Sequence, residues 1–175
     1  MDVIEQGVGR IFTDPDADKA REFFRHKSRA LVSKLTTVKD AVAKYVQDGD
    51  YVSIGGFGVN RIPAAVLHEI VRQGKKNLGL AGHTATHDFE ILSAGKCFNR
   101  CDAAYIIGLE ARGLSPNARQ YMESGEVEVS EWTNYTLAVR YKAACAGVSF
   151  HPIRNMMGTD TFKYSGAVKV KCPFT

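Results

Sequence analysis

Three short turns contain the residues whose types are best suited to chemistry. They span 55–63, 82–88 and 108–115, and each follows a short apolar run. If those runs are parallel strands, the three turns lie at the carboxyl edge of one sheet, where α/β proteins bind ligands. That rule therefore picks out these three turns as the places to look for a site.

The first turn is rich in glycine, with Gly55, Gly56 and Gly58 around Phe57. Glycines permit positive φ angles and close approach of a ligand to the backbone. Backbone N–H groups beside a helix N-terminus can hold an anion or a developing oxyanion. The spacing is not G-x-G-x-x-G and lacks a Walker lysine, so a nucleotide role is weakly supported. The alternative interpretation is a tight strand–helix corner.

The second and third turns supply groups for acid–base chemistry. Asp88 could orient a histidine, or Thr86 or Asp88 could simply cap a helix. For His87 we favour a structural role, whereas for His83 both interpretations stay open. Glu110 follows a buried strand, where desolvation would raise its pKa and suit it as base or nucleophile. It could also pair with Arg112 or Arg119 and simply hold the loop.

A metal site is a weaker hypothesis. Cys97 and Cys101 have C-x3-C spacing, and His83 and His87 have H-x3-H spacing, a combination that zinc sites can use. We disfavour zinc because the cysteines are expected on the far side of the following helix. Cys145, among small residues, is predicted to be a buried thiol. No metal and no permanently bound cofactor are expected.

Hydrophobic periodicity predicts the elements that position these turns. Helices are expected at 16–33, from 36 or 37 to about 47, and at 64–72, 86–94, 116–124 and 133–144. Strands are expected at 51–54, 77–81, 103–107, 127–129 and 145–150, and residues 151–175 are predicted to form an extended loop. Such alternation is typical of an α/β fold with an open, largely parallel, Rossmann-like sheet and flanking helices. We expect an N-terminal helical arm over 1–35 and an α/β domain over 36–175 that is incomplete at its C-terminus.

The chain has 175 residues, of which 45% are hydrophobic and 24% charged. This composition is that of an ordinary globular protein. No apolar run reaches the roughly 20 residues that span a bilayer, and the N-terminus lacks a secretory signal, so we expect a cytoplasmic protein without membrane contact. The formal net charge is +4, with basic residues concentrated early in the chain. That run is a solvated helix face or a contact for an anion or an acidic partner. No nucleic-acid motif accompanies it.

Four segments resemble the family I CoA-transferases, in particular the A-type subunits of the glutaconate CoA-transferase branch. These are Ser53–Pro63, Gly82–Asp88, Gly108–Pro116 and Met156–Asp160, so the resemblance covers roughly residues 30–175. It implies an A-type subunit that pairs with a B-type subunit to move CoA between an acyl-CoA and a carboxylic acid. The covalent glutamate is then on the B-type partner, and the CoA thioester is a substrate rather than a resident cofactor. The implied substrate-binding and oxyanion loop consists of Gly55, Gly56, Phe57, Gly58, Asn60 and Arg61.

Two alternatives remain on the same fold. The chain could belong to an acyl-CoA hydrolase, C–C lyase or decarboxylase, in which Glu110 and His83 would be the catalytic residues. It could also be a non-catalytic module that binds CoA ligands, or a truncated structural module. The resemblance alone does not separate these functions.

Overall fold

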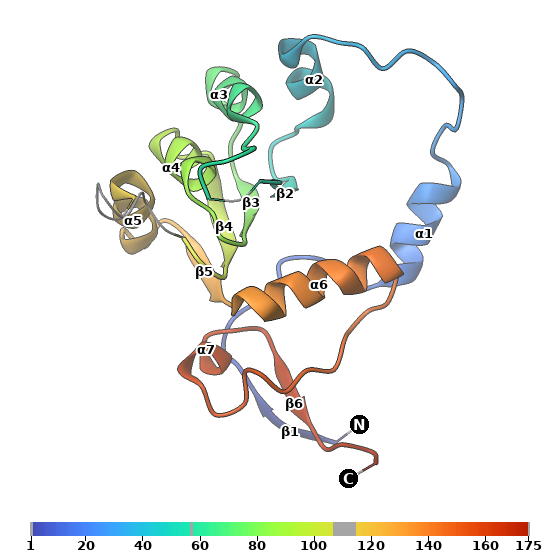
Figure 1. The fold of residues 1–175 in the computed structure, drawn as a ribbon, viewed down its shortest axis with the longest axis vertical. Coiled ribbons are helices and arrows are strands. Elements are labelled where there is room, and N and C mark those ends of the chain that lie inside the picture. The colour runs from blue at the N-terminus through green and yellow to red at the C-terminus, as the bar shows by residue number, and fades with distance from the viewer. Residues whose placement is uncertain (1, 57, 107–114, 175) are drawn as a thin grey trace.

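A four-stranded parallel sheet forms the centre of the protein in a computed structural model, which describes residues 2–56, 58–106 and 115–174. Its strands are β2 (Tyr51–Ser53), β3 (Leu78–Gly82), β4 (Phe98–Ala103) and β5 (Glu128–Glu131), paired in that order. Each pair is parallel, so all four carboxyl ends lie at one edge (Figure 1). The predicted α/β fold class is confirmed.

Four helices cover one face of this sheet. They are α2 (Val38–Tyr45), α3 (Ala64–Arg72), α4 (His87–Ala94) and α5 (Pro116–Glu123) (Figure 1). Their apolar side chains pack on buried strand residues, and Leu80, Phe89 and Phe98 are fully buried in the resulting core. The rings of Phe89 and Phe98 meet edge to face at 5.5 Å. This core holds the strands whose ends carry the candidate site.

The opposite face is crossed by α6 (Asn134–Ala146), anchored by a buried carboxylate. Asp102 is inaccessible to solvent, accepts a hydrogen bond from Trp132 Nε1 at 2.6 Å, and accepts another from the Tyr51 hydroxyl. Arg140 NH1 lies 2.8 Å from its Oδ1, and the guanidinium stacks 4.2 Å from the Trp132 ring centroid. Burial first, and the Asp102 charge second, raise the pKa of Tyr51. This network joins α6 to β2, the strand that leads into the glycine turn.

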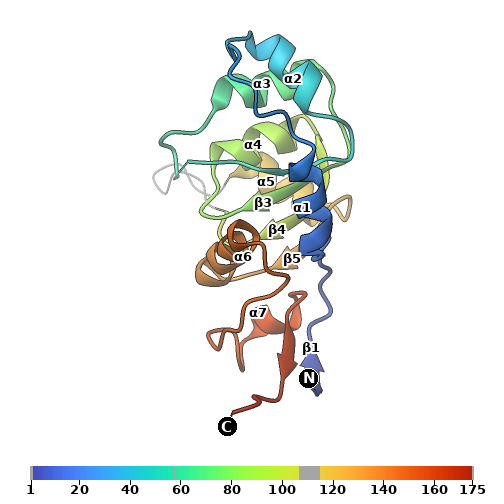
Figure 2. The same ribbon diagram turned by 90° about the vertical axis from the view of Figure 1, so that its right-hand side faces the viewer.

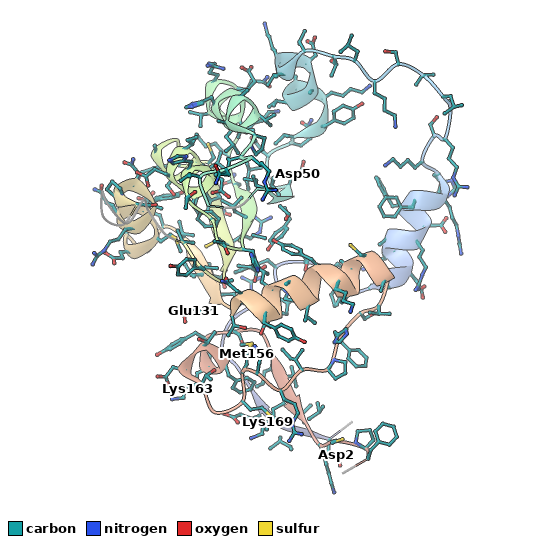
Figure 3. All side chains as sticks on the ribbon, in the orientation of Figure 1. Asp2, Asp50, Glu131, Met156, Lys163 and Lys169 are labelled. Carbon is teal, nitrogen blue, oxygen red and sulfur yellow. The ribbon has the colours of Figure 1, made fainter. Side chains whose placement is uncertain are left out.

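The two ends of the chain lie side by side. Strand β1 (Val3–Gln6) pairs antiparallel with β6 (Val168–Val170), and α7 (Asp160–Lys163) packs nearby (Figure 2). Met156 and Phe162 join Trp132 and Leu137 in a second, smaller core. Figure 3 shows Met156 between α6 and α7, and Lys169 on β6. The prediction of an extended loop over 151–175 was wrong, because the strand partner of this segment lies at the other end of the sequence. The division at residue 35 remains a proposal.

Three further predictions of elements were wrong. The first helix, α1 (Ala17–Arg25), ends well before residue 33. The strand expected at 103–107 lies earlier in the chain, as β4 at Phe98–Ala103, because the partners of Asp102 in space allow this polar residue to be buried within a strand. Residue 107 lies outside the described residues. Residues 145–150 do not form a strand: α6 continues to Ala146, and Cys145 is exposed rather than buried. No helix in the described parts of the chain is long and apolar enough to cross a membrane.

Candidate functional site

The glycine turn between β2 and α3 depends on backbone conformations that side chains disfavour. Gly56 has a φ of 137°, Gly58 of 55° and Arg61 of 61°. A Cβ on Gly56 would lie 3.1 Å from Ile62 Cγ1 and 3.2 Å from the carbonyl oxygens of Asn60 and Arg61. Gly55 has no such neighbour within 4 Å. Glycine is therefore the residue that fits position 56 without strain, on grounds of both conformation and space.

The second turn holds the first in place. The Gly58 N–H donates to the Thr84 carbonyl at 3.3 Å, and the Thr86 hydroxyl donates to the Gly58 carbonyl. Both backbone polar groups of Gly58 are therefore occupied. In contrast, the N–H groups of Gly55 and Gly56 have no acceptor among the residues that the structure describes. Both residues also line a polar cavity, so their amides are available to a ligand there.

The two turns enclose a small polar cavity of about 10 Å³. A space of this size holds roughly one water molecule or one ligand oxygen. The structure thus brings the first two predicted turns together, as the strand-end rule requires. The residues that line the cavity are Ile54, Gly55, Gly56, Gly58, Ile62, His83, Thr84 and Asp88.

Asp88 is the buried charge of this cavity. It is only 5% exposed, and its Oδ1 accepts a hydrogen bond from the Thr86 N–H at 2.7 Å. Burial raises the pKa of Asp88, while hydrogen bonds from the backbone N–H groups of Thr86, Phe89 and Asp88 itself oppose that rise. Asp88 therefore organises the first turn of α4, and its carboxylate also faces the glycine turn. Sequence reasoning weighed Asp88 as a helix cap or histidine partner and did not select it for the site.

The two histidines of the second turn have different surroundings. His83 is half-buried at the end of β3, lines the cavity, and has its Nδ1 3.2 Å from Thr84 Oγ1. His87 is exposed and does not line the cavity. No hydrogen bond joins either imidazole to Asp88 in the described structure. His83 is therefore the histidine positioned to meet a ligand, and its role is a proposal.

The remaining predicted site residues lie outside the cavity or outside the described residues. Asn60 and Arg61 are exposed on the distal part of the glycine turn. Phe57 and Glu110 fall at positions 57 and 107–114, which the structure does not describe. Across the described ranges, no cluster of three His, Cys, Asp or Glu side chains could hold a metal ion.

The cysteines of the zinc hypothesis are part of the core. Cys97 and Cys101 are both buried, and burial is the main factor that raises the pKa of each thiol. Neither lines the cavity with His83. Their C-x3-C spacing reflects packing beneath α4 and α5 rather than placement beside the candidate site.

The fold and the cavity define a class of protein. A parallel α/β sheet carries a glycine turn at the end of an edge strand, with open amides over a polar pocket. Such an arrangement suits a small-molecule ligand with a carbonyl or anionic oxygen. The family described as Coenzyme A transferase matches residues 35–172, and the chain belongs to this family.

The chain is also similar to individual proteins in sequence and to solved structures in fold. The chain is 42% identical to an uncharacterized protein of Archaeoglobus fulgidus, over 100% of this chain and 40% of that protein. It is 32% identical to the A-type subunit of glutaconate CoA-transferase from Acidaminococcus fermentans, over 79% of this chain and 44% of that protein. The solved structure of the Acidaminococcus enzyme superposes with a TM-score of 0.70 at 30% identity, covering 77% of this chain and 42% of that chain.

A decarboxylase has a similar fold. The structure of AibA/AibB superposes with a TM-score of 0.74 at 30% identity, covering 80% of this chain and 54% of that chain. The chain therefore spans about half, or less, of the length of these relatives. These similarities establish the family and the fold of the chain, but not its reaction.

Proposed function

We propose that this chain supplies the A-type half of a CoA-transferase active site, where it binds the thioester carbonyl of an acyl-CoA. The observation that carries the proposal is the pair of open amides, at Gly55 and Gly56, over the polar cavity. Membership of the Coenzyme A transferase family supports the same assignment. The partner would be a B-type subunit, and the second substrate a carboxylic acid.

The role of the glycine turn follows from the charge that develops during transfer. A glutamate carboxylate of the B-type partner attacks the thioester carbon, and the carbonyl oxygen becomes an oxyanion. The amides of Gly55 and Gly56 would donate to that oxygen. Expulsion of the CoA thiolate then leaves a mixed anhydride between the acyl group and the glutamate. Removing one such donor typically slows an enzyme about 100- to 1,000-fold.

The later steps return to the same oxygen-binding position. The CoA thiolate attacks the glutamyl carbonyl of the anhydride, releases the first carboxylate and forms a glutamyl-CoA thioester. The acceptor carboxylate then attacks the glutamyl-CoA thioester, releases the CoA thiolate and forms a new mixed anhydride with the glutamate. The thiolate attacks the acceptor's carbonyl in that anhydride, so the acceptor leaves as its CoA thioester and the free glutamate is restored. Because Asp88 is engaged by backbone N–H groups, part of its negative charge is neutralised beside this position. Thr84 and Thr86 keep the turn in the shape that presents the amides.

The test is reconstitution of the chain with a B-type subunit. Acetyl-CoA would be supplied with a panel of carboxylates that includes glutaconate, and CoA exchange would be followed by mass spectrometry. We expect turnover only when both chains and an acceptor acid are present. Borohydride should inactivate the complex after acetyl-CoA is added, with the modified glutamate on the B-type chain. Exchange by this chain alone, or consumption of acyl-CoA without acceptor, would contradict the proposal.

A second function is an acyl-CoA hydrolase, C–C lyase or decarboxylase. It is favoured by two acid–base groups of this chain, His83 and Asp88, that line the cavity, and by the similarity to a decarboxylase. Such an enzyme would consume one acyl-CoA without an acceptor acid. Glu110→Gln should be mild in a transferase and severe in a hydrolase. If the complex retains CoA but turns over nothing with any substrate, the chain is a non-catalytic binding module.

A further inference from the structure

We infer that residues 17–35, the part of the expected N-terminal arm that is called the arm from here on, are a docking element that binds an acidic surface of the B-type partner subunit. The identity of this partner rests on the function proposed above. The arm comprises α1 and most of the segment that leads to α2, and it precedes the region matched by the family, which begins at residue 35. The inference concerns an N-terminal element of this chain rather than the shared fold.

The arm buries almost nothing against its own chain. Every residue from 21 to 35 is exposed. Five of them are large hydrophobic residues, with exposures of 69% for Phe23, 55% for Phe24, 104% for Leu31, 66% for Val32 and 94% for Leu35. Apolar area left in water is unfavourable by about 25 cal/mol per Å², so a surface that covers these side chains gains that energy.

Few contacts tie the arm to the body. Arg21 donates to the Gly147 carbonyl at 2.5 Å, at the end of α6. Between α1 and α2, the hydrogen bonds of the chain are local, such as Val32 N–H to the Ala30 carbonyl at 3.1 Å. Figure 1 shows this segment passing from α1 to α2 well away from the sheet. A partner can therefore reach both its side chains and its backbone.

The arm also carries the net charge of the whole protein. It contains six Lys or Arg residues against two Asp or Glu, a net charge of +4, and the chain as a whole has +4. The remainder has seventeen residues of each sign. Three arm cations have no ion pair in the structure, although the whole arm is described: Lys27, Arg29 and Lys34. Lys27 lies over the Phe24 ring, with its Nζ 5.6 Å from the ring centroid. Cations without an ion pair, among exposed hydrophobic side chains, fit an acidic surface with apolar patches.

Other occupants fit less well. A second copy of this chain offers a body with no net charge and a second arm of the same sign. A membrane would leave the backbone polar groups of the non-helical part, 27–36, without partners in hydrocarbon. A protein surface can satisfy both the backbone and the charges. The geometry thus favours a different protein chain with a negative surface.

The experiment compares how the full chain binds the B-type partner in 50 and in 300 mM salt. The triple variant Lys27→Glu, Arg29→Glu, Lys34→Glu should weaken the complex by about tenfold or more at low salt, and wild-type binding should weaken as salt rises. Leu31→Ser with Leu35→Ser should weaken it at both salt concentrations. The matched control, Lys142→Glu, Arg154→Glu, Lys171→Glu, makes the same charge change at exposed sites and should bind within about twofold of wild type. All variants should keep the wild-type melting temperature, since the altered side chains are exposed.

Two results would overturn the inference. One is a complex that forms equally well with the arm variants and the control, and the other is binding of the arm to anionic lipid vesicles instead of the partner protein. The proposed function is tested separately by CoA exchange. An active complex that is indifferent to the arm refutes only the docking role. An arm-dependent complex without exchange activity refutes only the transferase.

Discussion

Replacing Gly56 by alanine should impair the active complex through the shape of the glycine turn. At a φ of 137°, a residue with a Cβ is strained by about 1–3 kcal/mol. The new Cβ would also lie 3.1–3.2 Å from Ile62 Cγ1 and from two backbone carbonyl oxygens, which must move by a few tenths of an ångström. Because the turn is exposed, it can relax locally without unfolding the sheet. The population with correctly placed amides should fall.

The magnitude follows from the strain. Since 1.36 kcal/mol corresponds to tenfold in rate, a strain of about 1–3 kcal/mol predicts a roughly 5- to 150-fold loss of kcat/KM. The assay is CoA exchange by the reconstituted complex. Urea unfolding, followed by fluorescence of the single tryptophan, Trp132, reports whether the sheet and α6 remain intact. We expect the unfolding midpoint to change little.

The matched control is Gly55→Ala in the same turn. Gly55 does not have a left-handed φ, and a Cβ there meets nothing within 4 Å, so the turn should keep its shape. Its N–H group also remains. We therefore expect a much smaller loss of kcat/KM than for Gly56→Ala. Equal losses in the two variants, or wild-type activity in Gly56→Ala, would refute the reasoning from strain.

Three further substitutions test the surroundings of the site. Burial holds the pKa of Asp88 above its usual value of 3.8, so its stabilising contribution is fully present at lower pH and is lost as the pH rises through the raised pKa. The melting temperature of Asp88→Asn relative to wild type should therefore increase from about pH 3 to 7, and a constant difference would contradict this. Tyr51→Phe removes a hydrogen bond to a buried carboxylate and should lower the free energy of unfolding by about 1.5–3 kcal/mol in urea titrations, whereas Tyr135→Phe, at an exposed site, should have no effect. Glu90→Ala removes the carboxylate that accepts two backbone N–H bonds, each 3.1 Å long, at the start of α5, and should cost about 0.5–2 kcal/mol, with Glu123→Ala near zero as its exposed control.

Helices with strong local signals could be predicted from the sequence. The expected helix at 64–72 coincides with α3, and the helices expected to start at 36 or 37 and at 133 follow the N-caps Thr37 and Thr133. These features depend on neighbours within one or two turns, so a local pattern contains the necessary information. The glycine turn was also evident, because few other residues permit its backbone.

Buried polar groups could not be assigned correctly from the sequence. Asp102 interrupts an apolar run, and its burial depends on Tyr51, Trp132 and Arg140, which come from distant parts of the chain. The cap of α5 shows the same limitation: Ser115 makes no side-chain cap, and Glu90 of α4 supplies the carboxylate instead. Each case depends on residues far apart in the chain.

The sequence by itself determined the alternation of strands and helices, the glycine turn and the resemblance to a CoA-transferase, since these follow from local spacing and residue type. Only the tertiary structure decided that Asp88 and His83 share a cavity with Gly56, because parallel strands bring separate turns to one edge. It also decided which amides are open, since the occupied N–H of Gly58 bonds to Thr84 across that edge. Hydrogen bonds between distant segments are set by packing, which local sequence patterns do not specify.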